Sequence, residues 1–301
     1  NLGVMHACGH DAHVAIGLTT ARIMAAHRDQ FSGKIKIVFQ PAEEGLGGAA
    51  KMISEDILDH LQADYALGIH VWNEMPMGWM GISAGPVMAA SETFSIIVRG
   101  KGGHGALPSA AIDPILASAA IITALQSIVA RNVHPLKTAV ISVTAVHGGQ
   151  AFNVIPQEVE LKGTIRTFEP NVRELVLTRF RQVAKGVANS MGCEVEIELQ
   201  SLTPALVNDN SVTHIVFSRA KELWPSAIIE SQYATMGSED MAFFLQKIPG
   251  CFIFIGSSNH LLGLEAPHHH PKFDIDENVM PIAVGLISTA AIDLLMNQEV
   301  V

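Results

Sequence analysis

Two hydrophobic periods alternate along the chain. Short runs rich in β-branched residues predict strands, whereas longer segments in which apolar residues recur every three or four positions predict helices. Outside the middle of the chain, the predicted strands are residues 34–39, 65–71 and 251–256. The predicted helices there are residues 11–27, 47–60, 211–224, 238–247 and 278–296. Strands and helices that alternate in this way are typical of the α/β class.

The middle of the chain has a different order, strand-helix-strand-strand-helix-strand. Its predicted elements are residues 92–100, 111–131, 138–147, 158–166, 171–191 and 193–200. This order is typical of a ferredoxin-like α+β domain. We therefore expect such a domain at residues 89–202, inserted into a discontinuous domain made of residues 1–88 and 203–301.

Composition limits the classes of function. Apolar residues make up 49% of the 301 residues, which is enough to bury a sizeable core. The formal charge of -10 argues against a nucleic acid or an anionic membrane surface as a partner. No uninterrupted apolar stretch reaches the roughly 18 residues expected of a membrane span. The cysteines are too few for a disulfide framework, which favours a cytoplasmic location.

Candidate chemistry begins near the start of the chain, where His6, Cys8, His10 and His13 lie within a few residues of one another. Cys8 and His10 suit an extended or turned segment, and Gly9 between them tolerates an unusual backbone angle. Thiol and imidazole ligands together favour zinc, nickel or cobalt over calcium or magnesium. From these residues alone, a metal site and a Cys/His-rich helix start with satisfied side chains remain equally open.

Further candidate ligands are spread over the rest of the chain. Glu43 and Glu44 follow the predicted strand at residues 34–39, and α/β sheets build their sites at the carboxyl ends of strands. One glutamate could bind a cation while the other deprotonates a water, although two solvated acids in a turn are the alternative. His70 lies near the end of a predicted strand, where a lone histidine is usually a core residue. Residues 268–270 are histidines between two prolines, in a segment that cannot be helical.

Short segments over nearly the whole chain carry a resemblance to a known family. They are residues 5–11 (MHACGHD), 40–45 (QPAEEG), 68–70 (GIH), 102–104 (GGH), 152–156 (FNVIP), 163–166 (GTIR), 236–240 (MGSED) and 269–274 (HHPKFD). In residues and in order they resemble the motifs of the M20 metallopeptidases, specifically the amidohydrolase branch with hippurate hydrolases, N-acyl-amino-acid deacylases and auxin-conjugate hydrolases. The resemblance implies a metallopeptidase-type catalytic domain with an inserted lid domain that mediates dimerisation.

The resemblance also implies a centre of two divalent metal ions, which could be zinc, manganese, nickel or cobalt. Its implied ligands are Cys8, His10, Glu44, His70 and His269. Glu43 is then the general base that takes a proton from a water activated by the metal ions. Cys8 stands where other M20 enzymes have a bridging aspartate. The histidines left outside the ligand set, with at most a hydrogen-bonding role around it, are His6, His13, His268 and His270.

Residues of the inserted domain are expected to complete the site. By resemblance, His104 reaches the active site of the partner subunit in a homodimer and stabilises the oxyanion. Arg166 is the candidate partner of a substrate carboxylate, because a guanidinium group binds carboxylates in bidentate fashion; a surface ion pair is the alternative. Asn153 is a candidate hydrogen-bond partner of the substrate backbone, or a turn residue. Helix capping is expected to explain at least one of Glu239 and Asp240.

The leading hypothesis is metal-dependent hydrolysis of the amide bond of N-acetyl, N-benzoyl or N-aryl-acetyl amino acids. A related dipeptidase or aminopeptidase is the second. A metal-free hydrolase that uses Cys8 with His10 or His13 is the third, and it leaves the glutamates and the distal histidines unexplained. The last is a relic that only dimerises, because family members have a long segment before the first motif. For the same reason we expect a truncated catalytic domain with exposed apolar edges.

Overall fold

The computed structural model describes residues 3–45 and 47–296, which form two compact units. The first unit contains the described residues up to Val87, then Leu206–Thr235, and those from Asp240 onward. The second contains Met88–Ala205 and Met236–Glu239. Both units mix helices and strands, so the predicted α/β class is confirmed. The second unit also takes in residues 236–239, which lie outside the inserted range of 89–202 expected from the sequence.

The first unit is built on a four-stranded sheet with the order β1-β12-β2-β11. The two longest strands, β1 (Ala66–Pro76) and β12 (Gly250–Ser258), are parallel neighbours. The short strands are β2 (Trp79–Gly81) and β11 (Ile228–Glu230). Because β12 has a neighbour on each side and is buried along almost its whole length, its sequence is a continuous apolar run without alternation.

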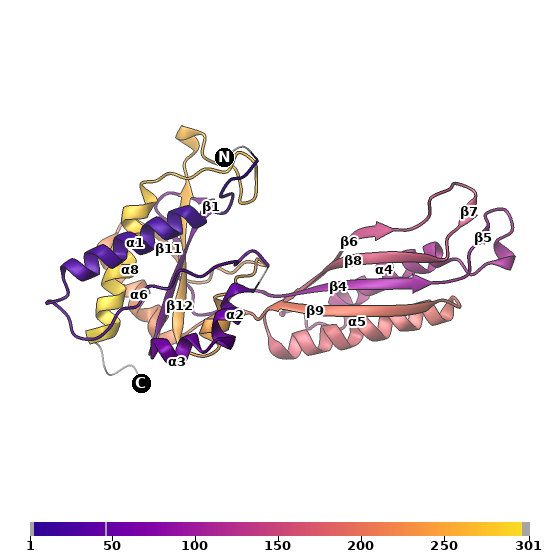
Figure 1. The fold of residues 1–301 in the computed structure, drawn as a ribbon, viewed down its shortest axis with the longest axis horizontal. Helices are drawn as coiled ribbons and strands as arrows, with labels where there is room; N and C mark the ends of the chain where they lie inside the picture. The colour runs from indigo at the N-terminus through magenta and orange to yellow at the C-terminus, as the bar shows by residue number, and fades with distance from the viewer. Residues whose placement is uncertain (1–2, 46, 297–301) are drawn as a thin grey trace. The chain divides into compact units, whose positions relative to one another are not determined.

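Helix α8 (Val279–Met296) packs against both α1 (His10–Ala26) and α6 (Asn210–Leu223), and all three helices contact this sheet (Figure 1). Their buried faces and the two long strands form one hydrophobic core, with Ile16, Val216, Leu286, Val71 and Ile253 among its members. Helix α6 begins where Asp209 Oδ1 accepts the amide protons of the first turn, a standard cap. This core holds the start of α1 against the middle of β1, where Gly9 closely approaches Val71.

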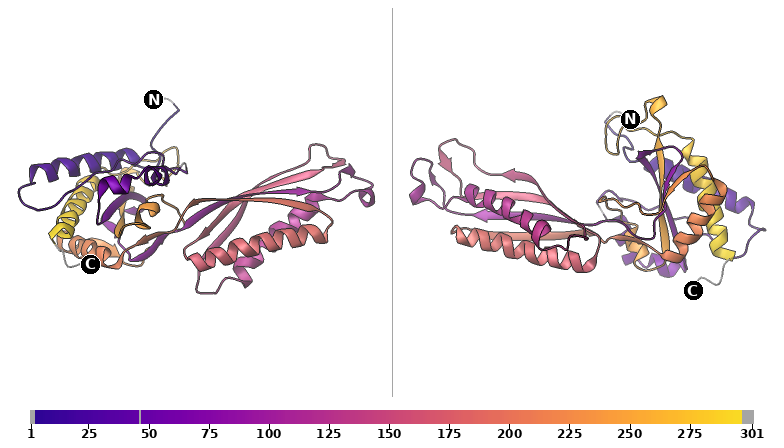
Figure 2. Two further views of the ribbon diagram at one scale, coloured as in Figure 1. Left: turned by 60° about the horizontal axis from the view of Figure 1, so that its bottom comes forward. Right: turned by 180° about the vertical axis from the view of Figure 1, so that it is seen from behind.

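The second unit contains a four-stranded antiparallel sheet with the order β6-β8-β4-β9. Helices α4 and α5 lie on one face of it (Figure 2) and bury their apolar stripes there. In chain order the elements are β4 (Ala90–Arg99), α4 (Pro114–Arg131), β6 (Ala139–His147), β8 (Glu158–Thr167), α5 (Pro170–Ser190) and β9 (Glu194–Thr203). The additional pieces are β5 (Gly103–His104) paired with β7 (Val154–Ile155), and the short helix η1 (Pro108–Ala110). The two-stranded sheet of β3 (Gly85–Met88) and β10 (Leu206–Asn208) belongs, apart from Met88, to the first unit.

The predicted strand at residues 34–39 is wrong. None of the strands in the described parts of the chain pairs with this segment, which is irregular. Val38 and Phe39 are 37% and 48% exposed, so the apolar run is not buried on both sides as a central strand would be. An apolar, β-branched sequence becomes a strand only where a neighbour supplies hydrogen bonds and packing.

Two of the predicted helices are shorter than expected. Residues 47–60 form α2 (Gly48–Ser54) and α3 (Ile57–Leu61), and the break falls at Asp56, whose φ of 60° lies in the left-handed region. Residues 238–247 contain only α7 (Ala242–Leu245). The residues before α7 are not helical, and one of them, Asp240, accepts a hydrogen bond from Ala49 in α2.

Helices α4 and α8 are long and apolar enough to cross a membrane by length and composition, contrary to the expectation from the sequence. Each of them packs within its own unit. Helix α4 buries Ile121 and Leu125 against the sheet, and α8 buries Leu286 and Leu294 among α1, α6 and the strands. Their hydrophobicity is therefore accounted for by the two cores.

Candidate metal centre

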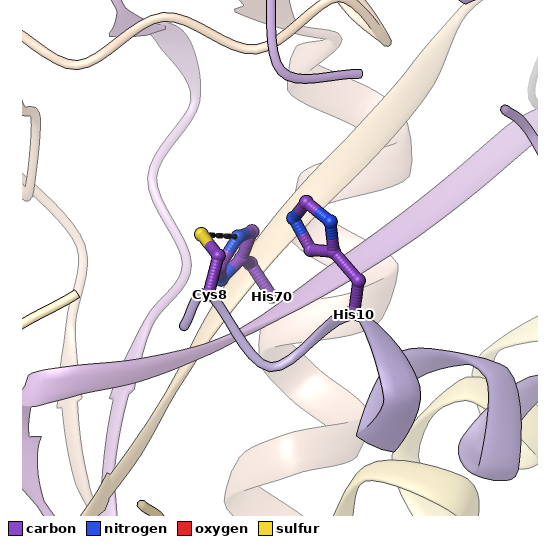
Figure 3. Close-up of side chains that lie close together, drawn as sticks. All are labelled: Cys8, His10 and His70. Atoms are coloured by element: carbon purple, nitrogen blue, oxygen red, sulfur yellow. Dashed lines mark hydrogen bonds between the residues drawn. The ribbon is translucent and has the colours of Figure 1, made fainter. Parts of the chain in front are cut away.

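Cys8 and His10 are positioned by the turn that begins α1. Gly9 is the N-cap residue, with a φ of 79° in the left-handed region, and a Cβ there would lie 2.4 Å from Cγ2 of Val71. Only glycine meets both demands, so Gly9 lets the chain approach β1 closely. This left-handed φ is the unusual backbone angle that Gly9 was expected from the sequence to tolerate. As a result, the Cys8 and His10 side chains lie beside His70, which is in the middle of β1 because the strand continues to Pro76 (Figure 3).

Glu43 and Glu44 lie on an irregular loop that is held at both ends. The Asp240 carboxylate accepts hydrogen bonds from the Gln40 side chain and, at 3.0 Å, from the Ala49 amide. The two donors therefore flank the glutamates in sequence, and Asp240 is completely buried. Asp240 does not cap the helix that follows it, as one of the two acids was expected to do, since α7 has no side-chain cap. This clamp fixes the glutamate loop relative to the segment before α7.

His269 approaches the same place from the far end of the chain. Its backbone N–H donates to the carbonyl oxygen of Ala7 at 2.7 Å, which ties the histidine-rich loop to the Cys8 segment. The residue adopts a left-handed backbone with a φ of 64°. Its Nε2 then lies 3.3 Å from Oε1 of Glu44.

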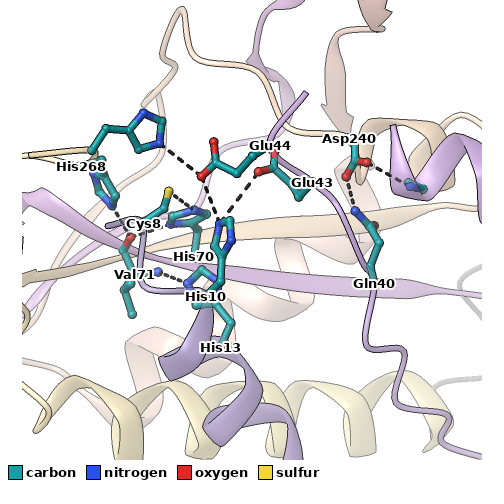
Figure 4. A network of polar contacts seen from close by, with 12 residues as sticks. Cys8, His10, His13, Gln40, Glu43, Glu44, His70, Val71, Asp240 and His268 are labelled. Atoms are coloured by element: carbon teal, nitrogen blue, oxygen red, sulfur yellow. Dashed lines mark hydrogen bonds and ion pairs between the residues drawn. The ribbon is translucent and has the colours of Figure 1, made fainter. Parts of the chain in front are cut away.

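The structure thus brings together all five predicted ligands and Glu43. Figure 4 labels four of these ligands, Cys8, His10, Glu44 and His70, together with Glu43. In one group, the ligand atoms of Cys8, His10 and His70 lie within 4.8 Å of one another. The Cys8 sulfur is 3.5 Å from Nε2 of His70. His70 is only 6% exposed, whereas the other two are half-buried, so this group forms the inner part of the cluster.

A second group joins Cys8, Glu44 and His269, again within 4.8 Å, and it lies nearer the surface. A third joins His10 to both glutamates, with His10 Nε2 at 3.8 Å from Glu43 and 3.9 Å from Glu44. Cys8 belongs to two of these groups and so does His10. An inner and an outer donor set that share a thiol could hold two adjacent cations, and thiolate, imidazole and carboxylate ligands suit zinc-like metals.

Burial sets the protonation of the cluster. Burial lowers the pKa of His70 to about 3, and neighbouring imidazoles add to the shift, so His70 is neutral and available as a ligand. Burial raises the pKa of Glu43 to about 7, and the negative charges of Glu44 and Asp240 raise it further. A carboxyl group with a pKa near neutrality is suited to accept and return a proton.

Two histidines outside the predicted ligand set lie against it. The rings of His13 and His268 have their centroids 4.4 and 5.4 Å from that of His70. The sequence could have indicated that His13 lies beside the ligands, because it follows His10 by three residues and so shares one face of α1 with it. No sequence signal could have found the Asp240 clamp, since its partners are about two hundred residues away.

The other predicted site residues, His104, Asn153 and Arg166, belong to the second unit. His104 is exposed on β5, and its Nδ1 accepts the Ala106 amide proton at 3.1 Å, which leaves the ring proton on Nε2, the outward donor. Asn153 is exposed, and its backbone carbonyl oxygen accepts a hydrogen bond from the backbone N–H of Gly105. Arg166 donates to Ser238 Oγ at 2.8 Å, and burial lowers its pKa.

Comparison with known proteins identifies the family. The model of Peptidase family M20/M25/M40 matches residues 1–293. The chain belongs to this family. The M20 chain is therefore a hydrolase of the peptidase and amidohydrolase type, as the motif resemblance implied.

Named relatives of this M20 chain act on different amides. It is 39% identical to "Thermostable carboxypeptidase 1" of Saccharolobus solfataricus, over 93% of this chain and 71% of the relative. It is 37% identical to "N-acetylcysteine deacetylase" of Bacillus subtilis, over 97% and 75%. A solved structure described as a dinuclear metal-binding peptidase from the M20 family, from Bacillus subtilis, superposes with a TM-score of 0.82 at 32% identity, covering 98% of this chain and 74% of that one. Metal binding is thus a property of a structural neighbour.

Proposed function

We propose that this M20 hydrolase uses two divalent metal ions to hydrolyse the amide bond of N-acyl amino acids, with Glu43 as the general base. The observation that carries the proposal is the pair of donor groups that share Cys8, one buried around His70 and one exposed around Glu44 and His269. Glu43 lies beside them at 3.8 Å from His10 and belongs to neither of these two groups.

The residues present fit a pair of cations. Thiol, imidazole and carboxylate groups face one another at short distances, and the buried His70 is neutral. When bound, the two ions would supply a water of lowered pKa and polarise the amide carbonyl. The metal could be zinc, manganese, nickel or cobalt, since all four accept this mixed ligand set.

Glu43 is assigned the proton transfers. Its carboxylate would take a proton from the attacking water and give it to the departing amine nitrogen, so that the glutamate ends the cycle as it began. The backbone N–H of Asp240 donates to this carboxylate, which supports its orientation. Glu44 would hold a cation instead, because its Oε1 faces both His10 and His269.

For the substrate, we propose an amide whose nitrogen belongs to an amino acid with a free carboxylate. Arg166 would bind that carboxylate, and Asn153 the substrate backbone. The similarity to a protein named N-acetylcysteine deacetylase supports acetyl as the acyl group of the substrate. Benzoyl and aryl-acetyl groups are further candidates. The similarity to a protein named carboxypeptidase supports a second class of substrate, peptides cleaved next to their C-terminal residue. Such peptides also present a free carboxylate beside the amide that is hydrolysed.

We also propose a homodimer formed through the second unit. Ile115 and Leu116 on α4 are 47% and 61% exposed, and β6 is an edge strand of the sheet. A second copy that covers this apolar helix face and open edge would remove both from water. His104 would then serve the partner subunit by donating its Nε2 proton to the oxyanion.

His104→Ala should lower kcat by about 100-fold or more, the usual effect of removing one oxyanion donor. Its metal content should match the parent, because His104 belongs to none of the donor groups found among the described residues. The checks are steady-state kinetics and metal analysis of the purified variant. His134→Ala changes another exposed histidine of the same unit and is the matched control. A turnover equal to that of the control would contradict the role of His104.

The whole proposal is tested by metal analysis combined with a substrate panel. The chain should bind about two ions, chelation should abolish turnover, and one of zinc, manganese, nickel or cobalt should restore it. N-acetyl, N-benzoyl and indole-acetyl amino acids should be hydrolysed faster than dipeptides with a free amine. Turnover that survives chelation would favour a cysteine hydrolase, and a chain that binds no stoichiometric metal would be a relic.

A further inference from the structure

One residue, Val71 on β1, hydrogen bonds to three imidazoles (Figure 4). Its N–H donates to Nε2 of His13 at 3.0 Å. Its carbonyl oxygen faces Nδ1 of His70 at 2.6 Å and Nε2 of His268 at 3.0 Å. In the described sheet β1 is an edge strand with β12 as its one neighbour, and at Val71 these rings take the place of a second neighbouring strand.

These contacts fix which nitrogen of each ring carries the proton. A carbonyl oxygen only accepts, so Nδ1 of His70 and Nε2 of His268 must both be protonated. A backbone N–H only donates, so Nε2 of His13 must be a bare lone pair. The other ring nitrogen of His70, Nε2, does not face this carbonyl oxygen and lies 3.5 Å from the Cys8 sulfur.

We propose that His13 is a positioning residue for the inner metal position, acting through Val71 on His70. The inference rests on the proposed function in one respect only, that His70 is a metal ligand. His13 anchors the N–H of the peptide that joins His70 to Val71, and the next carbonyl along the chain holds the proton of His70 on Nδ1. Only the two backbone torsions of Val71 separate the anchor from the oriented carbonyl.

Packing supports this role of His13. Its ring lies 4.4 Å from that of His70, edge to face at 73°, so the two rings also restrict each other sterically. Val71 is completely buried, and its N–H would lose its partner if the acceptor at residue 13 were removed. A buried donor without a partner is costly, so the backbone would shift to find one, and the carbonyl that orients His70 would shift with it.

The first test uses the metal-free parent protein. Nitrogen-15 NMR of the imidazoles should show His70 protonated on Nδ1 and His13 bare on Nε2. A proton on Nε2 of His70 would overturn the inference without any variant. This readout does not depend on metal binding, so it separates the inference from the proposed function.

The second test compares His13→Leu with His13→Gln, by zinc titration against a competing chelator. Leucine removes the acceptor and should weaken one of the two zinc-binding steps by about 10- to 100-fold, the usual cost of losing a partner of a ligand. Glutamine can place an acceptor oxygen near the position of Nε2 and should recover most of the affinity. His27→Leu, just past the end of α1, is the matched control, because His27 is exposed and its Nδ1 faces the carbonyl oxygen of Ile23.

Each outcome of the titration has a defined meaning. Parent-like affinity in His13→Leu would overturn the positioning role, and so would a glutamine variant as weak as the leucine variant. If His13→Leu does not fold, His13→Gln is still decisive, because it should bind zinc and keep His70 protonated on Nδ1. A parent protein that binds no zinc would contradict the proposed function, whereas the assignment of the His70 proton would stand or fall by NMR.

Discussion

Glu43→Gln should bind as much metal as the parent and hydrolyse N-acyl amino acids at least about 100-fold more slowly, because a general base contributes about 10²- to 10⁴-fold. Glutamine has the same shape but cannot accept the proton of the attacking water. Glu43 lies outside the two donor groups that share Cys8, so the ligands themselves are untouched. The measurements are kcat with saturating metal and the metal content after gel filtration.

A matched control for this variant is Glu55→Gln, which changes an exposed glutamate of the same region paired with Lys51. It should be fully active. If Glu43→Gln were as active as this control, another group would have to be the base. Loss of metal together with activity would instead identify Glu43 as a ligand.

The raised pKa of Glu43 gives the same variant a second readout, without metal. In the folded protein its pKa is about 7, against 4.5 for an ordinary glutamate. The folded state therefore holds the Glu43 proton more tightly than the unfolded state, and this stabilisation is complete below pH 4.5 and is lost as the pH rises through 7. Glutamine does not titrate and so loses no stability in this range. The Tm of metal-free Glu43→Gln, relative to that of the parent, should therefore rise as the pH increases from 5 to 8.

Cys8→Ala should abolish turnover and reduce bound metal from about two ions to less than one per chain. The reason is that Cys8 belongs to both the inner and the outer donor groups, so its loss affects both positions. Each of the other four predicted ligands belongs to only one of the two groups that contain Cys8. Metal analysis after dialysis against a weak chelator measures the effect.

Two further variants sharpen this result. Cys8→Asp should recover metal, because a carboxylate can also bridge two cations. Cys193→Ala removes a buried thiol of the second unit and should keep full metal content. If Cys8→Ala kept two tightly bound ions, the sulfur would not be a shared ligand and the two groups would have to be held by other atoms.

Local sequence patterns predicted the long elements well. Helices α1, α6 and α8 begin and end within a residue or so of the expected positions, since an apolar stripe is a local signal, to which Asp209 adds a polar cap at the start of α6. The same patterns failed at residues 34–39, where a strand needs a neighbour, and at residues 238–247, where a buried carboxylate bonds to α2 rather than to its own helix.

The sequence by itself determined the family and the set of candidate ligands, because residue types and their order along the chain carry that information. Only the tertiary structure decided that Cys8, His70, Glu44 and His269 meet within bonding reach, that Cys8 is shared, and that Asp240 clamps the glutamate loop. It also decided the protonation of His70 and Glu43. Distances between residues far apart in the chain, and the burial that shifts a pKa, are set by how the whole chain packs, and no local pattern encodes them.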